Sequence, residues 1–170
     1  QRLWKDDIVG SLAHVKGLGH SGILPMAEVA QIESALHQVA QEFEQGTFVF
    51  VAGEEDIHTS IERRVTQIAG PVGGKVHTGR SRNDQCVTAL RLWTKRELIL
   101  LATRLVDLCE VLSARAEIAG WGADGVYLPG YTHVQRAQPV LLAHHLMAHA
   151  WAFTRDIDRL EKMKYEYKKV

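Results

Sequence analysis

The sequence has only two cysteines, four prolines, no excess of charge of either sign and no long apolar run. Twenty Lys and Arg residues balance 20 Asp and Glu residues, so no net field attracts nucleic acid or a membrane surface. No stretch approaches the roughly 20 apolar residues of a membrane span, and we expect no signal peptide. Cys86 and Cys109 share one helical pattern, too far apart for a disulfide. We therefore expect a reducing, cytoplasmic location.

With few helix breakers, the apolar residues of the first half follow helical spacing. They recur every three or four positions over residues 6–16, 25–43 and 56–69. A stretch rich in Gly and Pro at 70–74 ends this series. The pattern predicts a small N-terminal helical domain, to which we assign residues 1–81.

Two longer helical patterns follow, over residues 84–119 and 139–168, separated by a loop at 121–130. The first would span about 54 Å at the rise of an α-helix, a length typical of extended bundles. The start of the second is apolar or small on almost every face, so other helices must cover it. We expect an all-α protein in which residues 82–170 form the first, incomplete part of a central helix bundle.

A polar segment, His77–Gln85, precedes the first long helix and contains no large apolar residue. Backbone N–H groups at a helix start, with the Ser81 hydroxyl, the Asn83 amide and the Arg82 guanidinium, suit a carboxylate ligand. The alternative is a solvated loop in which Ser81 or Asn83 caps the helix.

A second polar segment, Gly130–Pro139, precedes the second long helix. It offers the hydroxyl of Thr132 and the imidazole of His133, which can transfer protons near neutral pH. The pairing of a carboxylate-binding segment with a proton-transfer segment favours an enzyme.

The two segments resemble signature regions of the argininosuccinate lyases and δ-crystallins, within the fumarase/aspartase superfamily. The motif G-R-S-R-N-D-Q occupies residues 79–85, and the motif T-H-x-Q-x-A-Q-P occupies residues 132–139. A third motif, E-D-I-H-T, occupies residues 55–59. The resemblance extends over nearly all 170 residues. The chain starts without Met, stops within a helical pattern and lacks the family's serine loop, so we expect it to be part of a longer protein.

The resemblance implies reversible cleavage of argininosuccinate to L-arginine and fumarate, as in arginine biosynthesis and the urea cycle, by a homotetramer without metal or organic cofactor. It implies that His133 performs acid or base catalysis; the sequence does not decide which. It also implies substrate binding by Ser11, Asn83 and Thr132 and a place for His58 at the edge of the active site. The donor chemistry of Ser81 and Arg82 adds these two to the candidate substrate-binding residues. The isolated chain is expected to be inactive without the serine loop.

Other readings of these residues stay open. A catalytically silent, crystallin-like relative can keep the same residues, and adenylosuccinate lyase, fumarase and aspartase are further candidates within the superfamily. His58 also follows Glu54-Glu55-Asp56, which is typical of an acidic helix start.

Two motifs favour no function. The G-x-G-x-x-G run at 17–22 follows a charged helical pattern and precedes no βαβ unit, so we interpret it as a link between helices rather than a dinucleotide site. His144, His145 and His149 lack the glutamate and the spacing of a zinc hydrolase motif. We expect them to bond neighbouring helices rather than a metal.

Overall fold

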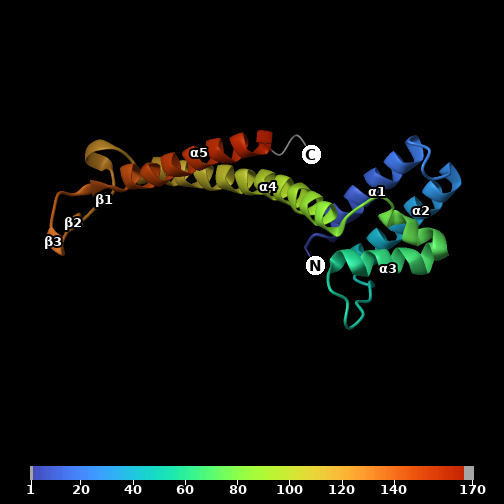
Figure 1. Ribbon diagram of the computed structural model, residues 1–170. Coiled ribbons are helices and arrows are strands. Elements are labelled where there is room, and N and C mark those ends of the chain that lie inside the picture. Colours follow the sequence, from blue (N-terminus) through green and yellow to red (C-terminus); the bar gives the residue numbers. More distant parts are fainter. Residues whose placement is uncertain (1, 167–170) are drawn as a thin grey trace. The chain divides into compact units, whose positions relative to one another are not determined.

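The computed structural model describes residues 2–166, which contain five α-helices, two 3-10 helices and four strands of two residues each (Figure 1). The predicted all-α class is confirmed. Two compact units divide between Thr94 and Lys95, within helix α4 (Arg82–Ala119). The boundary predicted between Ser81 and Arg82 falls at the start of that helix, and this domain assignment stays a prediction. No helix among the described residues is long and apolar enough to cross a membrane.

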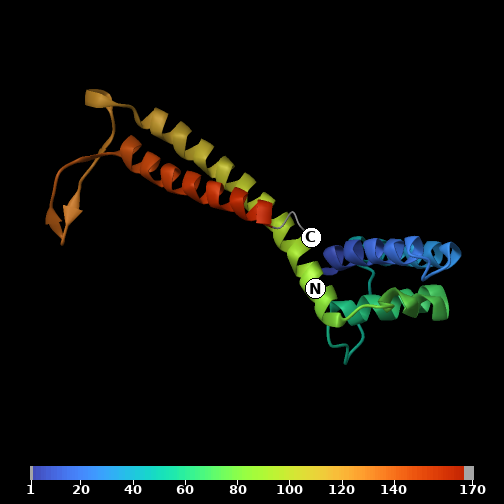
Figure 2. The ribbon, with the colours of Figure 1, turned by 45° about the horizontal axis from the view of Figure 1, so that its top comes forward.

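The first unit encloses one apolar core, built by α1 (Trp4–His20), α2 (Met26–Glu44), α3 (Ile57–Ala69) and the 3-10 helix η1 (Gly70–His77) (Figure 2). The largest fully buried apolar side chains are Val15, Val29, Ile32, Leu36, Val39 and Val65. They occupy the helical positions that the apolar spacing predicted, so the core forms along the periodic faces.

Helix α1 includes the first four residues of the glycine motif at 17–22. The sequence analysis interpreted the whole motif as a link between helices, so the interpretation was wrong for residues 17–20. Gly17 and Gly19 lie in the last turns of α1. A Cβ at Gly19 would lie only 2.9 Å from Cγ2 of Val29, so glycine permits the close approach of α1 to α2. The helix ends at His20, and Gly22, just beyond the C-cap residue Ser21, adopts a φ of 74°.

The second unit contains the later part of α4 and α5 (Leu142–Glu166), which lie side by side in both views (Figures 1 and 2). Small residues, Ala116, Ala119 and Ala143, are buried between them. Short antiparallel pairs connect the helices: β1 (Tyr127–Leu128) with β4 (Val140–Leu141), and β2 (Tyr131–Thr132) with β3 (Gln135–Arg136).

The second long helix begins later than predicted, at Leu142 instead of Pro139. Val140 and Leu141 pair with β1, which the helical periodicity did not reveal. The predicted end at Lys168 lies outside the described residues.

An ion pair between Glu42 and Arg64 joins α2 to α3. Arg64 Nη2 and Nε donate to Glu42 Oε1 and Oε2 at 2.6 and 2.8 Å. The hydrogen bonds from Arg64 hold the pKa of Glu42 below its ordinary value. A carboxylate with a depressed folded-state pKa stabilises the fold above its unfolded pKa, and this contribution is lost as the pH falls through the folded value.

We therefore expect Glu42→Gln to lower the free energy of unfolding by about 1 kcal/mol at pH 7, since the pair is only partly buried. The difference from the parent chain should vanish as the pH falls through and below 4.5, the ordinary value of a glutamate. Urea unfolding followed by circular dichroism at graded pH measures it. A difference that persists unchanged at low pH would contradict the ion-pair account.

Candidate functional site

The start of α4 is capped by its own polar segment. Ser81 Oγ accepts the backbone N–H of Asn83 at 3.2 Å, and Asp84 Oδ2 accepts the N–H of Ser81 at 2.8 Å. This reciprocal arrangement satisfies donors that the helix leaves open. The side-chain amide of Asn83 is exposed and makes no hydrogen bond within residues 2–166. The capping alternative is thus realised by Ser81, while Asn83 keeps its amide free for a ligand.

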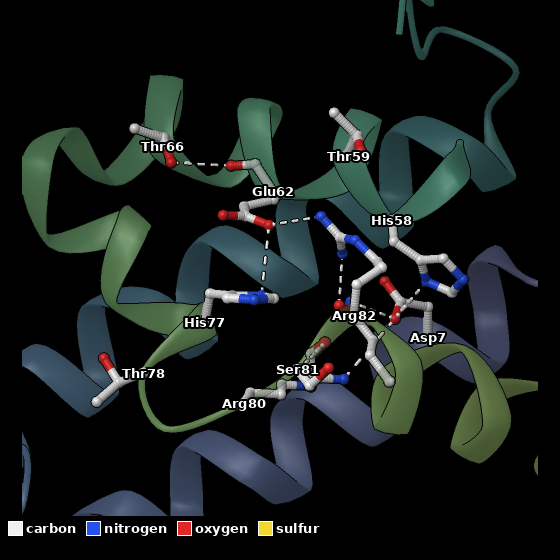
Figure 3. A network of polar contacts seen from close by, with 12 residues as sticks. Asp7, His58, Thr59, Glu62, Thr66, His77, Thr78, Arg80, Ser81 and Arg82 are labelled. Atoms are coloured by element: carbon white, nitrogen blue, oxygen red, sulfur yellow. Dashed lines mark hydrogen bonds and ion pairs between the residues drawn. The ribbon is translucent and has the colours of Figure 1, made fainter. Parts of the chain in front are cut away.

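A buried carboxylate, Asp7, organises the polar interior beside this helix start (Figure 3). Its Oδ1 accepts a hydrogen bond from Gln85 Nε2 at 2.8 Å and lies 2.9 Å from His58 Nδ1. Arg80 lies 3.9 Å from the same oxygen and donates to Ser11 Oγ at 3.0 Å. Two predicted substrate-binding residues, Ser11 and His58, are therefore brought together around Asp7.

The charges of this cluster are balanced inside the protein. Burial lowers the pKa of Arg80, and the carboxylates of Asp7 and Asp84 oppose that shift. Because a guanidinium stays protonated in proteins, Arg80 remains a cation and offsets the buried Asp7. The space enclosed by the cluster holds about one water molecule. In this conformation the cluster supports the site rather than containing a substrate.

Arg82 points toward α3 and is engaged there (Figure 3). Its Nη2 donates to Glu62 Oε2 at 3.0 Å, its Nη1 donates to Gln85 Oε1, and its Nε lies 3.9 Å from Asp56 Oδ2. His77 Nδ1 lies 3.6 Å from the same Glu62 oxygen. A ligand carboxylate that bound Arg82 would compete with Glu62.

Asp56 is the N-cap of α3, and its Oδ1 accepts the N–H of Thr59 at 2.7 Å. Burial raises the pKa of Asp56, but hydrogen bonds from Thr59 and the nearby Arg82 outweigh that effect and lower the pKa overall. The acidic helix start proposed from the sequence is thus realised by Asp56. His58 lies in the first turn of α3 and is free to face Asp7.

Thr132 and His133 lie at the tip of the β2–β3 hairpin in the second unit. Thr132 pairs with Gln135, which leaves His133 and Val134 as a two-residue turn. Both have positive φ, 50° and 67°, and both side chains are exposed. Positive φ is uncommon for these residue types and a true outlier for a β-branched one. Such backbone strain concentrates at functional positions.

The predicted site residues thus fall into two groups. Ser11, His58, Ser81, Arg82 and Asn83 belong to the first unit, and Thr132 and His133 to the second. The sequence analysis missed the residues that support the first group: Asp7, Glu62, Arg80 and Gln85. Two of these stand inside the G-R-S-R-N-D-Q run, but their burial gives no signal in a sequence.

The histidines of α5 are exposed rather than bonded to a neighbouring helix. The rings of His145 and His149 meet edge to face at 4.9 Å. Within residues 2–166 they join no group of three metal-binding side chains. The only such group in that range consists of Asp56, His58 and Cys86.

Comparison with known proteins agrees with this architecture. The chain is 49% identical over 159 residues to argininosuccinate lyase of Symbiobacterium thermophilum, covering 94% of the chain and 34% of the relative. It is 49% identical over 160 residues to argininosuccinate lyase of Herpetosiphon aurantiacus, with the same coverage. The chain thus spans about a third of the length of these relatives.

Solved structures show the same fold. An EDDS lyase in complex with formate matches with a TM-score of 0.75 and 26% identity, over 98% of this chain and 31% of that one. A fumarate lyase:delta crystallin from Brucella melitensis matches with a TM-score of 0.78 and 21% identity, over 98% of this chain and 42% of that one. The resemblance stated from the motifs is confirmed. Because the family model described as Lyase matches residues 1–170, the chain belongs to the lyase family.

Proposed function

We propose that the chain forms part of an argininosuccinate lyase, a carbon–nitrogen lyase that cleaves argininosuccinate to L-arginine and fumarate. The observation that carries the proposal is the 49% identity to argininosuccinate lyases over 94% of the chain. Such an enzyme serves arginine biosynthesis or the urea cycle. The free thiols of Cys86 and Cys109 support a reducing, cytoplasmic setting.

The reaction is an elimination with two proton movements. A base removes a proton from the carbon next to a carboxylate, and the electron pair of that C–H bond becomes the double bond of fumarate. The adjacent C–N bond breaks, its electrons remain on the guanidino nitrogen of arginine, and an acid transfers the second proton to that nitrogen. Negative charge develops on the carboxylate during proton removal, so preorganised donors around it lower the barrier.

The polar side chains divide into two roles in this proposal. Asn83, Thr132 and His133 are exposed and hold no internal hydrogen bond through their side chains within the described range. We assign carboxylate binding to the first two and proton transfer to His133. Ser11 and His58, fixed around the buried Asp7, support the site from inside the first unit. Ser81 caps the start of α4, and Arg82 binds a substrate carboxylate in competition with Glu62.

Unpaired apolar surface in the second unit supports a homotetramer. A groove between α4 and α5 is lined by Val106, Cys109, Met147, Ala150, Trp151 and Ile157. Trp151 is 62% exposed and Ile118 is 76% exposed. Apolar surface left exposed on paired long helices needs further helices to cover it.

The activity test uses a hybrid protein in which residues 1–170 replace the matching third of the Symbiobacterium lyase. We expect the hybrid to release fumarate from argininosuccinate, followed by absorbance, and to form a tetramer by light scattering. The 170-residue chain alone should self-associate and release none.

Substrate choice tests the assignment. Release of fumarate from adenylosuccinate or aspartate in preference to argininosuccinate would replace the proposed substrate. A folded, tetrameric hybrid with no turnover would favour the catalytically silent, crystallin-like alternative. A monomeric 170-residue chain that cleaves argininosuccinate would contradict the oligomer and the need for the rest of the enzyme.

A further inference from the structure

Three metal-binding side chains converge where α3 begins beside the first turns of α4. A carboxylate oxygen of Asp56, a ring nitrogen of His58 and Sγ of Cys86 all lie within 4.8 Å of one another. Asp56 and His58 belong to the start of α3, and Cys86 to the second turn of α4. All three lie in the first compact unit.

The surroundings of His58 give an independent indication of a ligand. The residue is 3% exposed, and its Nδ1 lies 2.9 Å from Oδ1 of the buried Asp7. A carboxylate at one ring nitrogen is how proteins orient a histidine whose other nitrogen binds a metal.

We propose that Asp56, His58 and Cys86 bind a borderline-soft divalent cation, represented by Zn²⁺. One sulfur, one imidazole nitrogen and one carboxylate oxygen form a donor set that zinc accepts and that Mg²⁺ and Ca²⁺ do not favour. Ligands of tetrahedral zinc lie about 3.3–3.8 Å apart, from the bond lengths and angle, so the three groups need to close by only about 1 Å. The sequence analysis expected no metal in this protein, and the proposed site differs from that expectation.

Coordination replaces the S–H bond of Cys86 by a metal–thiolate bond and releases the proton to solvent. The carboxylate and the thiolate then offset the charge of the dication. A fourth position remains for water.

The neighbouring charges leave room for the ion. Asp56 Oδ1 accepts the Thr59 N–H, whereas its Oδ2 lies 3.9 Å from Arg82 Nε, too long for a hydrogen bond. Arg82 keeps its bonds to Glu62 and Gln85 if the ion takes Oδ2. The Arg82 guanidinium therefore loses no hydrogen bond when a metal ion binds.

The test uses the whole 170-residue chain, reduced and freed of metal. Zn²⁺ competition with a chromophoric chelator should show one ion per chain, and Co²⁺ should give a near-ultraviolet thiolate-to-cobalt band with tetrahedral d–d bands. Cys86→Ser should abolish the thiolate band and weaken Zn²⁺ binding by roughly 100-fold or more, because one of the three protein ligands is lost. Asp56→Asn, which preserves the helix cap, should weaken it while leaving the band in place.

Cys109→Ser is the matched control, because this second thiol lies in α4 away from the three ligands and contacts Ala150 O at 3.7 Å. It should leave the affinity and the spectrum unchanged. Circular dichroism verifies that each variant is folded. If Cys86→Ser does not fold, Cys86→Ala replaces it as the variant that lacks the thiol. Absence of stoichiometric Zn²⁺ binding, or a cobalt spectrum unaffected by both Cys86 variants, would overturn the site.

Discussion

A hybrid lyase carrying His133→Asn is expected to lose roughly 100-fold or more of its kcat, the usual contribution of a positioned proton-transfer group. Asparagine suits the position because it tolerates the left-handed backbone, with φ of 50°, that the turn imposes. The variant therefore removes the titratable ring while preserving the hairpin. Initial rates of fumarate release over a range of argininosuccinate concentrations measure the effect.

Val134→Asn is the matched control, since it places the same side chain on the adjacent turn residue. Val134 is 91% exposed and, as a β-branched residue with a φ of 67°, is strained, so the exchange relieves the backbone and should leave kcat unchanged. Near-normal turnover in a folded His133→Asn tetramer would remove this histidine from the mechanism. An equal loss in both variants would assign the effect to the turn instead of the imidazole.

Replacing Arg82 by lysine is expected to cost about 1–3 kcal/mol of transition-state stabilisation, because lysine keeps the charge but loses the planar fork. The guanidinium lies at the start of α4, where the free amide of Asn83 also stands. The loss should appear in kcat/KM for argininosuccinate, measured at low substrate concentration.

Glu62→Gln separates substrate binding from a structural role for Arg82. Glu62 holds Arg82 Nη2 at 3.0 Å, so removing its charge frees the guanidinium for a substrate carboxylate. We expect this variant to retain kcat/KM while Arg82→Lys loses it. If both variants change only the melting temperature, Arg82 serves the packing of α3 against α4 and binds no substrate.

The helices could be predicted because their apolar faces are regular. The start of α3 and the end of α4 agree with the prediction, since Asp56 caps the first helix and Gly120, with a φ of 74°, follows the second. The late start of α5, at Leu142, could not be predicted, because pairing of Val140 with Leu128 is a tertiary contact. The extent of α1 was missed because a glycine that normally ends a helix here allows two helices to approach.

The candidate site could be predicted only in part. The motif wording identified Asn83, Thr132 and His133, whose exposure leaves them free for a ligand. It gave no indication that Asp7 is buried as the shared partner of His58 and Gln85. The turn at His133 was also beyond prediction, because two-residue hairpin turns normally select Asn-Gly or related pairs.

The unequal cores of the two units have a consequence for the order of folding. The first unit buries large aliphatic side chains from three helices, whereas the side chains fully buried between α4 and α5 in the described part of the chain are alanines. Regions with few buried apolar contacts open most easily, so slow amide exchange belongs to α1, α2 and α3. The paired long helices gain comparable protection only through assembly. The N-terminal helices can therefore act as an early folding nucleus. The exposed apolar face of α4 and α5 is the surface that a chaperone would bind until the subunits assemble.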